Sequence, residues 1–379
     1  MDLTWSAAEQ AFRAEARAWL GANVPTTPLP SGDTREGFAR HLEWERRLFD
    51  AGWAVVSWPE AYGGREASIW EWLLFEEEYY RAGAPQRVTQ NGIFLLAPTL
   101  FEFGTTEQRD RFLAKMASGE ETWCQGWSEP DAGSDLAGIT SRAERDDAAC
   151  GWRLSGQKTW TTRGAFCTHL FGLYRTDRTA ERHRGLTYFL VPLDSPGVTV
   201  RGFGRLDGDE GFAEVFCDDV FVPDSLVLGE VDQGWKVAMA TTGSERGLTL
   251  RSPGRFTATT ARLVELTKAR AADDPLARQR VAQACIDAEA YRLQTLSTVT
   301  KLSEGRPPGA ESSLTNVFWS ELDVSLHASA LALLGGEAEL DDSPWMKSWQ
   351  FALSGPIYAG TNEIQRNVIA ERVLGLPRK

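Results

Sequence analysis

The strongest constraint on the fold is a block of β-type sequence, about residues 123 to 230, which separates two long stretches of helical sequence. Three runs in this block are rich in aromatic and β-branched side chains, as strands are: 170–174, 186–191 and 215–222. Strands and helices therefore do not alternate along the chain. This order disfavours a doubly wound nucleotide-binding fold, and neither a GxGxxG nor a GxxxxGK[ST] motif is present.

Apolar residues recur at helical spacing on both sides of the block. The spacing predicts helices over about 3–23, 36–51 and 68–81, a helix capped by Thr105 or Thr106, and helices over 235–268, 278–303 and 362–372. We expect an α+β multidomain protein. Its parts would be an N-terminal all-α domain (1–122), a central antiparallel β-barrel or sandwich domain (123–230) and a C-terminal four-helix-bundle-like domain (231–379).

Charge and cysteine usage exclude several classes of function. Forty Lys and Arg against 53 Asp and Glu give a net charge of −13, which argues against nucleic acid as a partner. No apolar run approaches the roughly 20 residues that span a bilayer, so we expect no membrane insertion. Five scattered cysteines without a CxxC motif predict a reducing, cytoplasmic location and no metal site. His41 and Glu45, at i,i+4 spacing, are interpreted as a solvated helix face.

Three segments are candidates for carrying chemistry: 125–135, 156–164 and 354–367. The first is rich in small residues and hydroxyls, which let backbone N–H groups approach a polar ligand, but ordinary turns have the same composition. The second places Trp160 between hydroxyls and is either a ring-binding strand or a strand with a buried Trp. In the third, Thr361 or Asn362 is a good N-cap, either of an anion-attracting helix end or of an ordinary helix.

Together these segments carry a family resemblance. Ser-Glu-Pro-Asp-Ala-Gly-Ser-Asp at 128–135, Gly-Gln-Lys-Thr-Trp-Thr-Thr at 156–162 and Gly-Thr-Asn-Glu-Ile-Gln-Arg at 360–366 occur in order. With them, the chain resembles the acyl-CoA dehydrogenase family of flavoproteins over essentially its whole length. The resemblance implies FAD-dependent oxidation of an acyl-CoA, or of a carrier-bound acyl thioester, to the 2,3-enoyl thioester. A carboxylate removes the α-proton while the β-hydrogen leaves as hydride to flavin N5. An electron-transfer flavoprotein as acceptor and a dimer or tetramer are implied as well.

The resemblance also assigns residues to the cofactor and the substrate. FAD is expected between the β domain and the C-terminal helices, with Trp160 against the ring and Thr162 donating toward N5. The residues matching cofactor positions are Gln125, Trp127, Ser128, Ser134, Trp160, Thr162, Arg270, Gly335, Gly336, Thr361 and Glu363. Those expected at the substrate are Ser134, Arg246, Tyr358, Ala359 and Gly360.

The catalytic base departs from the common pattern of the family. Many members carry it immediately before the Gly-Thr of the third motif, where this chain has Ala359. Some branches, similar to isovaleryl-CoA and sterol side-chain acyl-CoA dehydrogenases, carry it on an internal helix directly before an Arg. That position is Glu245, followed by Arg246. The alternative for Glu245 is a solvated or salt-bridged helix residue.

A second departure concerns the cofactor segment after Lys268. Arg270 is kept, but the expected aromatic-Gly turn is replaced by Asp273 and Asp274, whose charges oppose a pyrophosphate. Either FAD is held differently, or a non-identical subunit supplies the missing contacts. Two alternatives to a self-sufficient dehydrogenase therefore stay open. One is a non-catalytic or cofactor-sharing subunit of a heteromer, and the other is an oxygen-using oxidase or hydroxylase of the same superfamily.

Overall fold

The computed structural model describes residues 4–245, 252–306, 309–340 and 343–377. The chain forms two compact units. Unit 1 comprises Met1–Thr26, Ala67–Ala84 and Arg246–Lys379, and unit 2 comprises Thr27–Glu66 and Pro85–Glu245. Unit 1 therefore unites helices from the two ends of the chain, whereas unit 2 contains all the β-type sequence.

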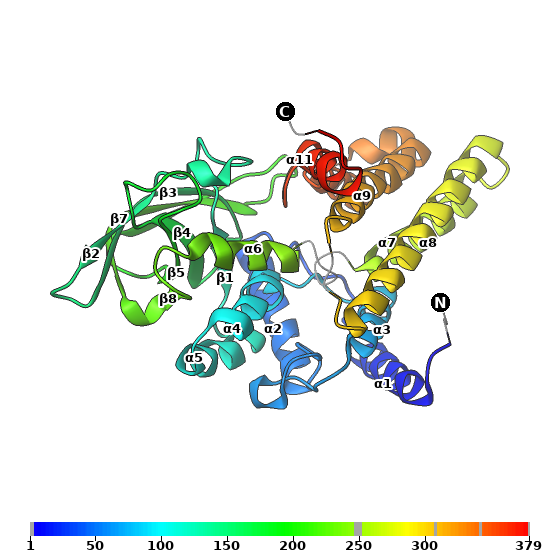
Figure 1. Ribbon diagram of the computed structural model, residues 1–379. Coiled ribbons are helices and arrows are strands. Elements are labelled where there is room, and N and C mark those ends of the chain that lie inside the picture. The colour runs from blue at the N-terminus through cyan, green and yellow to red at the C-terminus, as the bar shows by residue number, and fades with distance from the viewer. Residues whose placement is uncertain (1–3, 246–251, 307–308, 341–342, 378–379) are drawn as a thin grey trace. The chain divides into compact units, whose positions relative to one another are not determined.

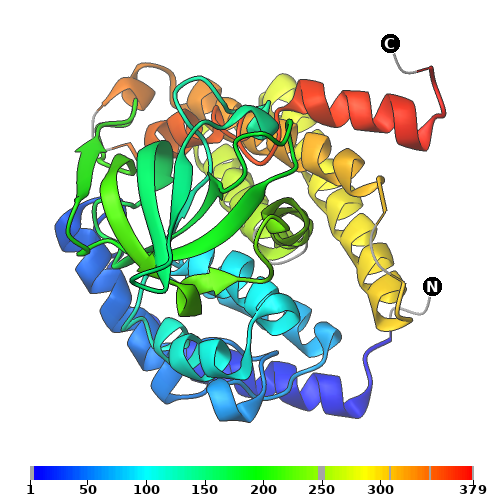
Figure 2. The same ribbon diagram turned by 60° about the vertical axis from the view of Figure 1, so that its left-hand side comes forward.

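The core of unit 2 is a mixed sheet, shown in Figure 2. In the described residues its strands follow the order β6-β7-β3-β2-β4-β5-β8, and β1 pairs with β4. Their bounds are β1 Trp123–Gly126, β2 Arg142–Asp146, β3 Gly151–Thr162, β4 His169–Arg175, β5 Leu186–Pro192, β6 Val198–Phe203, β7 Phe212–Pro223 and β8 Val227–Leu228. The three predicted strand runs are β4, β5 and part of β7. The expected antiparallel pairing holds for most neighbours, but β1 and β2 each run parallel to β4, so the sheet is mixed.

Alternate side chains of these strands form one apolar cluster. Leu154 of β3, Val215 of β7 and Phe189 of β5 are all buried in it. The described helices of unit 2 are α2 Arg35–Asp50, η1 Glu60–Tyr62, η2 Asn91–Leu96, α4 Ala97–Phe103, α5 Thr106–Ala117, η3 Leu136–Gly138, η4 Asp224–Leu226 and α6 Gly234–Glu245.

The predicted cap of α5 is confirmed at Thr105. Its hydroxyl accepts from the Gln108 N–H at 3.2 Å, and the Gln108 side chain accepts from the Thr105 N–H at 3.1 Å, which is a capping box. The Gln108 amide also donates to the carbonyl oxygens of Ser225 and Val227. This one side chain therefore caps a helix and fastens it to the end of the sheet.

His41 and Glu45 are buried, contrary to the expected solvated face. The two ring nitrogens of His41 lie 2.7 and 3.0 Å from the carbonyl oxygens of Gln86 and Pro30. The Glu45 carboxylate accepts from the Arg87 guanidinium at 3.1 Å. This face of α2 is buried because the segment at 86–89 supplies polar partners from far away in the sequence.

Unit 1 is built from long helices, seen as α7, α8 and α9 in Figure 1. Its described helices are α1 Ala7–Asn23, α3 Ile69–Arg81, α7 Pro253–Arg270, α8 Pro275–Ser303, α9 Ser312–Leu334, η5 Gly335–Glu339, α10 Pro344–Ala352, α11 Asn362–Val368 and η6 Ile369–Val373. The single helix predicted over 235–268 is wrong at Ser252, which has ψ 130° and caps the start of α7. Residues 246–251 of that prediction lie outside the described part.

Helix α9 has no counterpart among the predicted helices. Within the described residues, the segment Ser312–Glu339 is long and apolar enough to cross a membrane by length and composition alone. In the fold, its residues Trp319, Leu322 and Leu326 are buried against Phe256 and Tyr291. The segment therefore supplies part of the apolar core of unit 1.

Candidate active site

The first two motif segments lie side by side in unit 2. The Thr159 N–H donates to the Ser128 carbonyl at 2.9 Å, so the segment after β1 runs along β3. Gln125 and Ser128 are half-buried, Trp127 is buried and Ser134 is exposed on the loop that follows. The structure therefore brings together predicted residues that are more than 30 positions apart.

A bulge in β3 turns Trp160 outward. The pairing register of β3 with β7 shifts between Lys158 and Thr161. Trp160 has φ 59° and is 60% exposed, and its ring stands edge-on to Phe203 and Phe212 at 5.3 and 5.6 Å. A left-handed conformation costs a non-glycine residue about 1–2 kcal/mol, and bulges commonly re-aim a side chain. The result is an exposed indole face beside Thr162.

A chain of contacts leads from Trp127 to helix α6. The Trp127 ring stands edge-on to Tyr188 at 6.4 Å, and the Tyr188 hydroxyl lies 3.4 Å from the Thr241 hydroxyl. Thr241 also contacts the Thr99 hydroxyl at 2.8 Å. Position 245 is the last of α6, one helical turn beyond Thr241. The side chain of Glu245 and the whole of Arg246 lie outside the described part of the chain.

The third motif forms a tightly held loop in unit 1. Ala359 and Gly360 have φ of 59° and 86°, and the Gln365 amide donates to the Ala359 carbonyl at 3.1 Å. The Thr361 hydroxyl caps α11 by accepting from the Ile364 N–H at 3.2 Å. The loop thus places a left-handed alanine where many members of the resembled family carry a carboxylate. Glu363 is exposed, and Tyr358 is half-buried.

Two of the predicted cofactor segments of unit 1 meet through a salt bridge. Arg270, at the end of α7, pairs with both oxygens of Glu337 at 2.9 and 2.6 Å, and Glu337 directly follows Gly335 and Gly336. The hydrogen bonds from Arg270 lower the pKa of the Glu337 carboxyl. Sequence reasoning missed Glu337 as a partner, because 67 residues separate it from Arg270 and no local pattern links them.

The described residues of unit 2 fit a planar ring with a polar edge. The buried Trp127 indole N–H has no hydrogen-bond partner within the described residues. An unsatisfied buried donor costs about 1–3 kcal/mol, and a bound acceptor would remove that cost. Together with the exposed Trp160 face, this donor suits a flavin.

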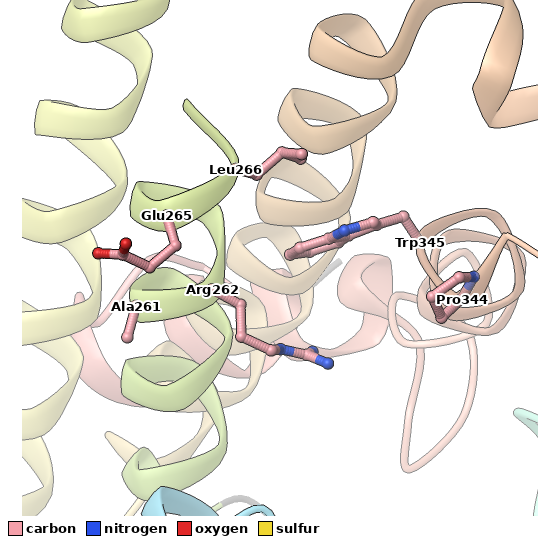
Figure 3. A pocket seen from close by; sticks show the side chains of 6 residues that line it. All are labelled: Ala261, Arg262, Glu265, Leu266, Pro344 and Trp345. Carbon is pink, nitrogen blue, oxygen red and sulfur yellow. The ribbon is translucent and has the colours of Figure 1, made fainter. Parts of the chain in front are cut away.

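A separate hollow of about 530 Å³ lies in unit 1 between α7 and α10. In Figure 3, Arg262 extends beneath Trp345, whereas Glu265 points away on the other side of α7. The Arg262 guanidinium lies 5.1 Å from the centre of the Trp345 ring. The six lining residues are Ala261, Arg262, Glu265, Leu266, Pro344 and Trp345. None of them is a predicted site residue, so the proposed chemistry does not involve this hollow.

The order of helical, β and helical parts, together with the three motifs, defines a flavoprotein oxidoreductase. Comparison with known protein families gives the same class. The acyl-CoA dehydrogenase N-terminal domain family matches residues 6–120, the middle domain matches 124–220 and the C-terminal domain matches 232–374. The chain belongs to the acyl-CoA dehydrogenase family, whose cofactor is FAD. The predicted family, fold class, enzyme class and cofactor are thereby confirmed. The domain limits at 122 and 230 and the roles of individual residues stay predictions.

Named relatives and solved structures extend the likeness along the whole chain. It is 41% identical to acyl-CoA dehydrogenase IpdE1 of Mycolicibacterium smegmatis, covering 98% of each chain. The solved Tcur3481-Tcur3483 steroid ACAD superposes with a TM-score of 0.90 at 28% identity and covers 100% of each chain. A chain of the ChsE4-ChsE5 complex from Mycobacterium tuberculosis gives 0.85 at 27%, also covering 100% of each chain.

Proposed function

We propose that the chain oxidises an acyl-CoA thioester to the 2,3-enoyl-CoA, with Glu245 as the base that removes the α-proton. The observation that carries the proposal is the contact chain in unit 2. It joins α6, through Thr241 and Tyr188, to Trp127 in the first motif. The first motif is in turn hydrogen-bonded to β3, which carries Trp160.

The residues of this chain have distinct proposed tasks. Gln125, Trp127, Ser128, Trp160 and Thr162 would hold the flavin ring, which when bound supplies the acceptor for the β-hydride. The proposed contacts of the rest of FAD are Ser134, Arg270, Gly335, Gly336, Thr361 and Glu363.

Removing a weakly acidic α-proton needs a carboxylate that is held close and shielded from water. Ala359 cannot accept a proton, which leaves Glu245 as the proposed base. The indoles of Trp127 and Trp160 would exclude water on the flavin side. At the substrate we propose Ser134, Arg246, Tyr358, Ala359 and Gly360. The methyl side chain of Ala359 and the lack of a side chain at Gly360 would leave room for a bulky acyl group.

We infer a branched or polycyclic acyl group as the substrate class. Support comes from the proposed base at Glu245 and from the likeness to the steroid ACAD. The electrons would pass to an electron-transfer flavoprotein, and the protein would act as a dimer or tetramer in the cytoplasm.

A bleaching screen tests the proposed reaction. Straight, branched and steroidal acyl-CoAs are added anaerobically to the flavin-loaded protein, and absorbance near the flavin maximum is followed. We expect bleaching, fastest with the branched and polycyclic compounds. A flavin that no acyl-CoA reduces would refute the proposal. Fast reoxidation by air, without an electron-transfer flavoprotein, would instead favour the oxidase alternative.

A second candidate is a cofactor-sharing subunit of a heteromer. Two observations favour this candidate. The Arg270 guanidinium, expected at the cofactor, is paired with Glu337 of the same chain. The exposed Asp273 and Asp274 at the start of α8 carry charges that oppose a pyrophosphate. The names of two structural neighbours, Tcur3481-Tcur3483 and ChsE4-ChsE5, each join two proteins. For this candidate, we expect the chain purified alone to be colourless and to take up FAD only with a second subunit. A yellow protein obtained from this chain alone would rule it out.

A further inference from the structure

Lys158 is a completely buried lysine in the middle of β3, and the proposed chemistry gives it no task. Its ammonium donates to Glu129 at 2.8 Å and to the Leu173 carbonyl of β4 at 2.7 Å. It also lies 4.7 Å from the centre of the Tyr174 ring. Two hydrogen-bond acceptors and one aromatic ring therefore surround the ammonium.

Both oxygens of the buried Glu129 carboxylate accept hydrogen bonds. Its carboxylate accepts from Lys158, from the Ser141 N–H at 3.0 Å, and from the N–H and hydroxyl of Thr140 at 2.6 and 2.9 Å. Burial alone would raise the pKa of Glu129, but the Lys158 charge and these donors outweigh it and hold that pKa at about 2. The carboxylate is therefore ionised throughout the neutral range.

The Lys158–Glu129 ion pair links the first two motif segments, 125–135 and 156–164, next to the bulge in β3. Glu129 directly follows Ser128 in the first motif, and Lys158 precedes Trp160 by two residues. The Thr159–Ser128 backbone hydrogen bond lies beside the pair. The left-handed Trp160 is a strained conformation, and such strain persists only where the surroundings fix it.

Stability alone is a poor explanation for this pair. Replacing a buried ion pair with well-packed hydrophobic side chains of similar volume is often neutral or even stabilising, whereas removing one partner is strongly destabilising. A fully satisfied polar network instead specifies one geometry. For the Lys158–Glu129 pair, the geometry in question is the position of Trp127 and Ser128 relative to Trp160.

We propose that Lys158 and Glu129 are positioning residues whose ion pair fixes the Trp127–Ser128 segment against the Trp160–Thr162 segment. The inference rests on the proposed function, since those segments are proposed to line the flavin ring. Neither residue is proposed to touch the reacting atoms. They act through the side chains that they hold in place.

The double variant Glu129→Gln/Lys158→Met is the decisive test, because it removes both charges and nearly keeps the volume. In the flavin-loaded enzyme, we expect a modest fall in melting temperature, because the NH₂ group of the glutamine would face the N–H of Thr140 or Ser141. We also expect kcat to fall about 10- to 100-fold, as misplacement of reacting groups does, with KM changed less than about threefold. The flavin absorption bands should shift, and FAD should bind the apoprotein more weakly. The single variant Lys158→Met should unfold at a still lower temperature, because a buried carboxylate loses its cation.

Glu78→Gln is a matched control in unit 1. Glu78 is a buried carboxylate held by Arg13 at 2.6 Å and Arg17 at 2.9 Å, and it lies in no motif. Its loss should lower the melting temperature and leave the flavin bands unchanged. A double variant with wild-type kcat, flavin bands and FAD affinity would overturn the positioning role. If acyl-CoA fails to bleach even the wild-type flavin, the absorption bands and FAD affinity still test the pair independently of the proposed function.

Discussion

Replacing Glu245 by glutamine is expected to slow acyl-CoA-dependent bleaching of the flavin by about 10²- to 10⁴-fold, the usual contribution of a general base. Glutamine has nearly the same size as glutamate but cannot accept the α-proton. FAD should therefore stay bound with an unchanged absorption spectrum. Anaerobic stopped-flow absorbance with an acyl-CoA that bleaches the wild type measures the rate directly.

Two further variants make this result specific to position 245. Glu265→Gln removes an exposed helical carboxylate that pairs with Lys268, and it should bleach at the wild-type rate. Ala359→Glu in the Glu245→Gln background places a carboxylate where many family members carry the base, and it should recover part of the lost rate. Unchanged bleaching in Glu245→Gln would remove this residue from the role of base.

Much of the fold follows from local sequence patterns. The strands β4, β5 and β7 are recognisable because aromatic and β-branched residues are concentrated in them. The Thr105 cap is recognisable from Gln108 three residues later. Helix α9 escapes the same reasoning. Its buried face includes polar side chains such as Asn316 and Asp323, whereas the apolar Phe318 is exposed, so its apolar residues show no clear helical period.

Likewise, only part of the candidate site is predictable from the sequence. Motif residues such as Trp160 and Thr361 are identifiable from the sequence because their spacing resembles that of a known family. The residues that hold them are not, because Tyr188 and Glu337 reach their partners only through tertiary contacts. The buried His41 shows the same limit, since its polar partners come from loops that no helical pattern reveals.

Asp33→Asn is expected to have the largest effect on stability, destabilising unit 2 by about 3–5 kcal/mol, the usual effect of removing one partner of a buried ion pair. Asp33 is 4% exposed and lies 2.7 Å from the Arg163 guanidinium and 2.8 Å from that of Arg205. Arg163 directly follows Thr162 and has φ 56°. An asparagine would leave two largely buried cations facing a neutral amide. Thermal and urea unfolding of the variant measure the loss.

A matched control and a pH series separate the charge of Asp33 from its size. Asp207→Asn removes a carboxylate that pairs with Arg205 alone among the ion pairs described, so its loss should be smaller. Burial by itself would raise the pKa of Asp33, but Arg163 and Arg205 outweigh it and hold that pKa below its ordinary value. A lowered folded pKa means that the stabilisation is fully present above the unfolded pKa of about 3.9 and is lost as pH falls through the folded pKa. The difference in stability between wild type and Asp33→Asn should therefore be constant near pH 7 and shrink below about pH 4. A difference that persists unchanged into acid would show that shape, and not the ionised carboxylate, is what Asp33 contributes.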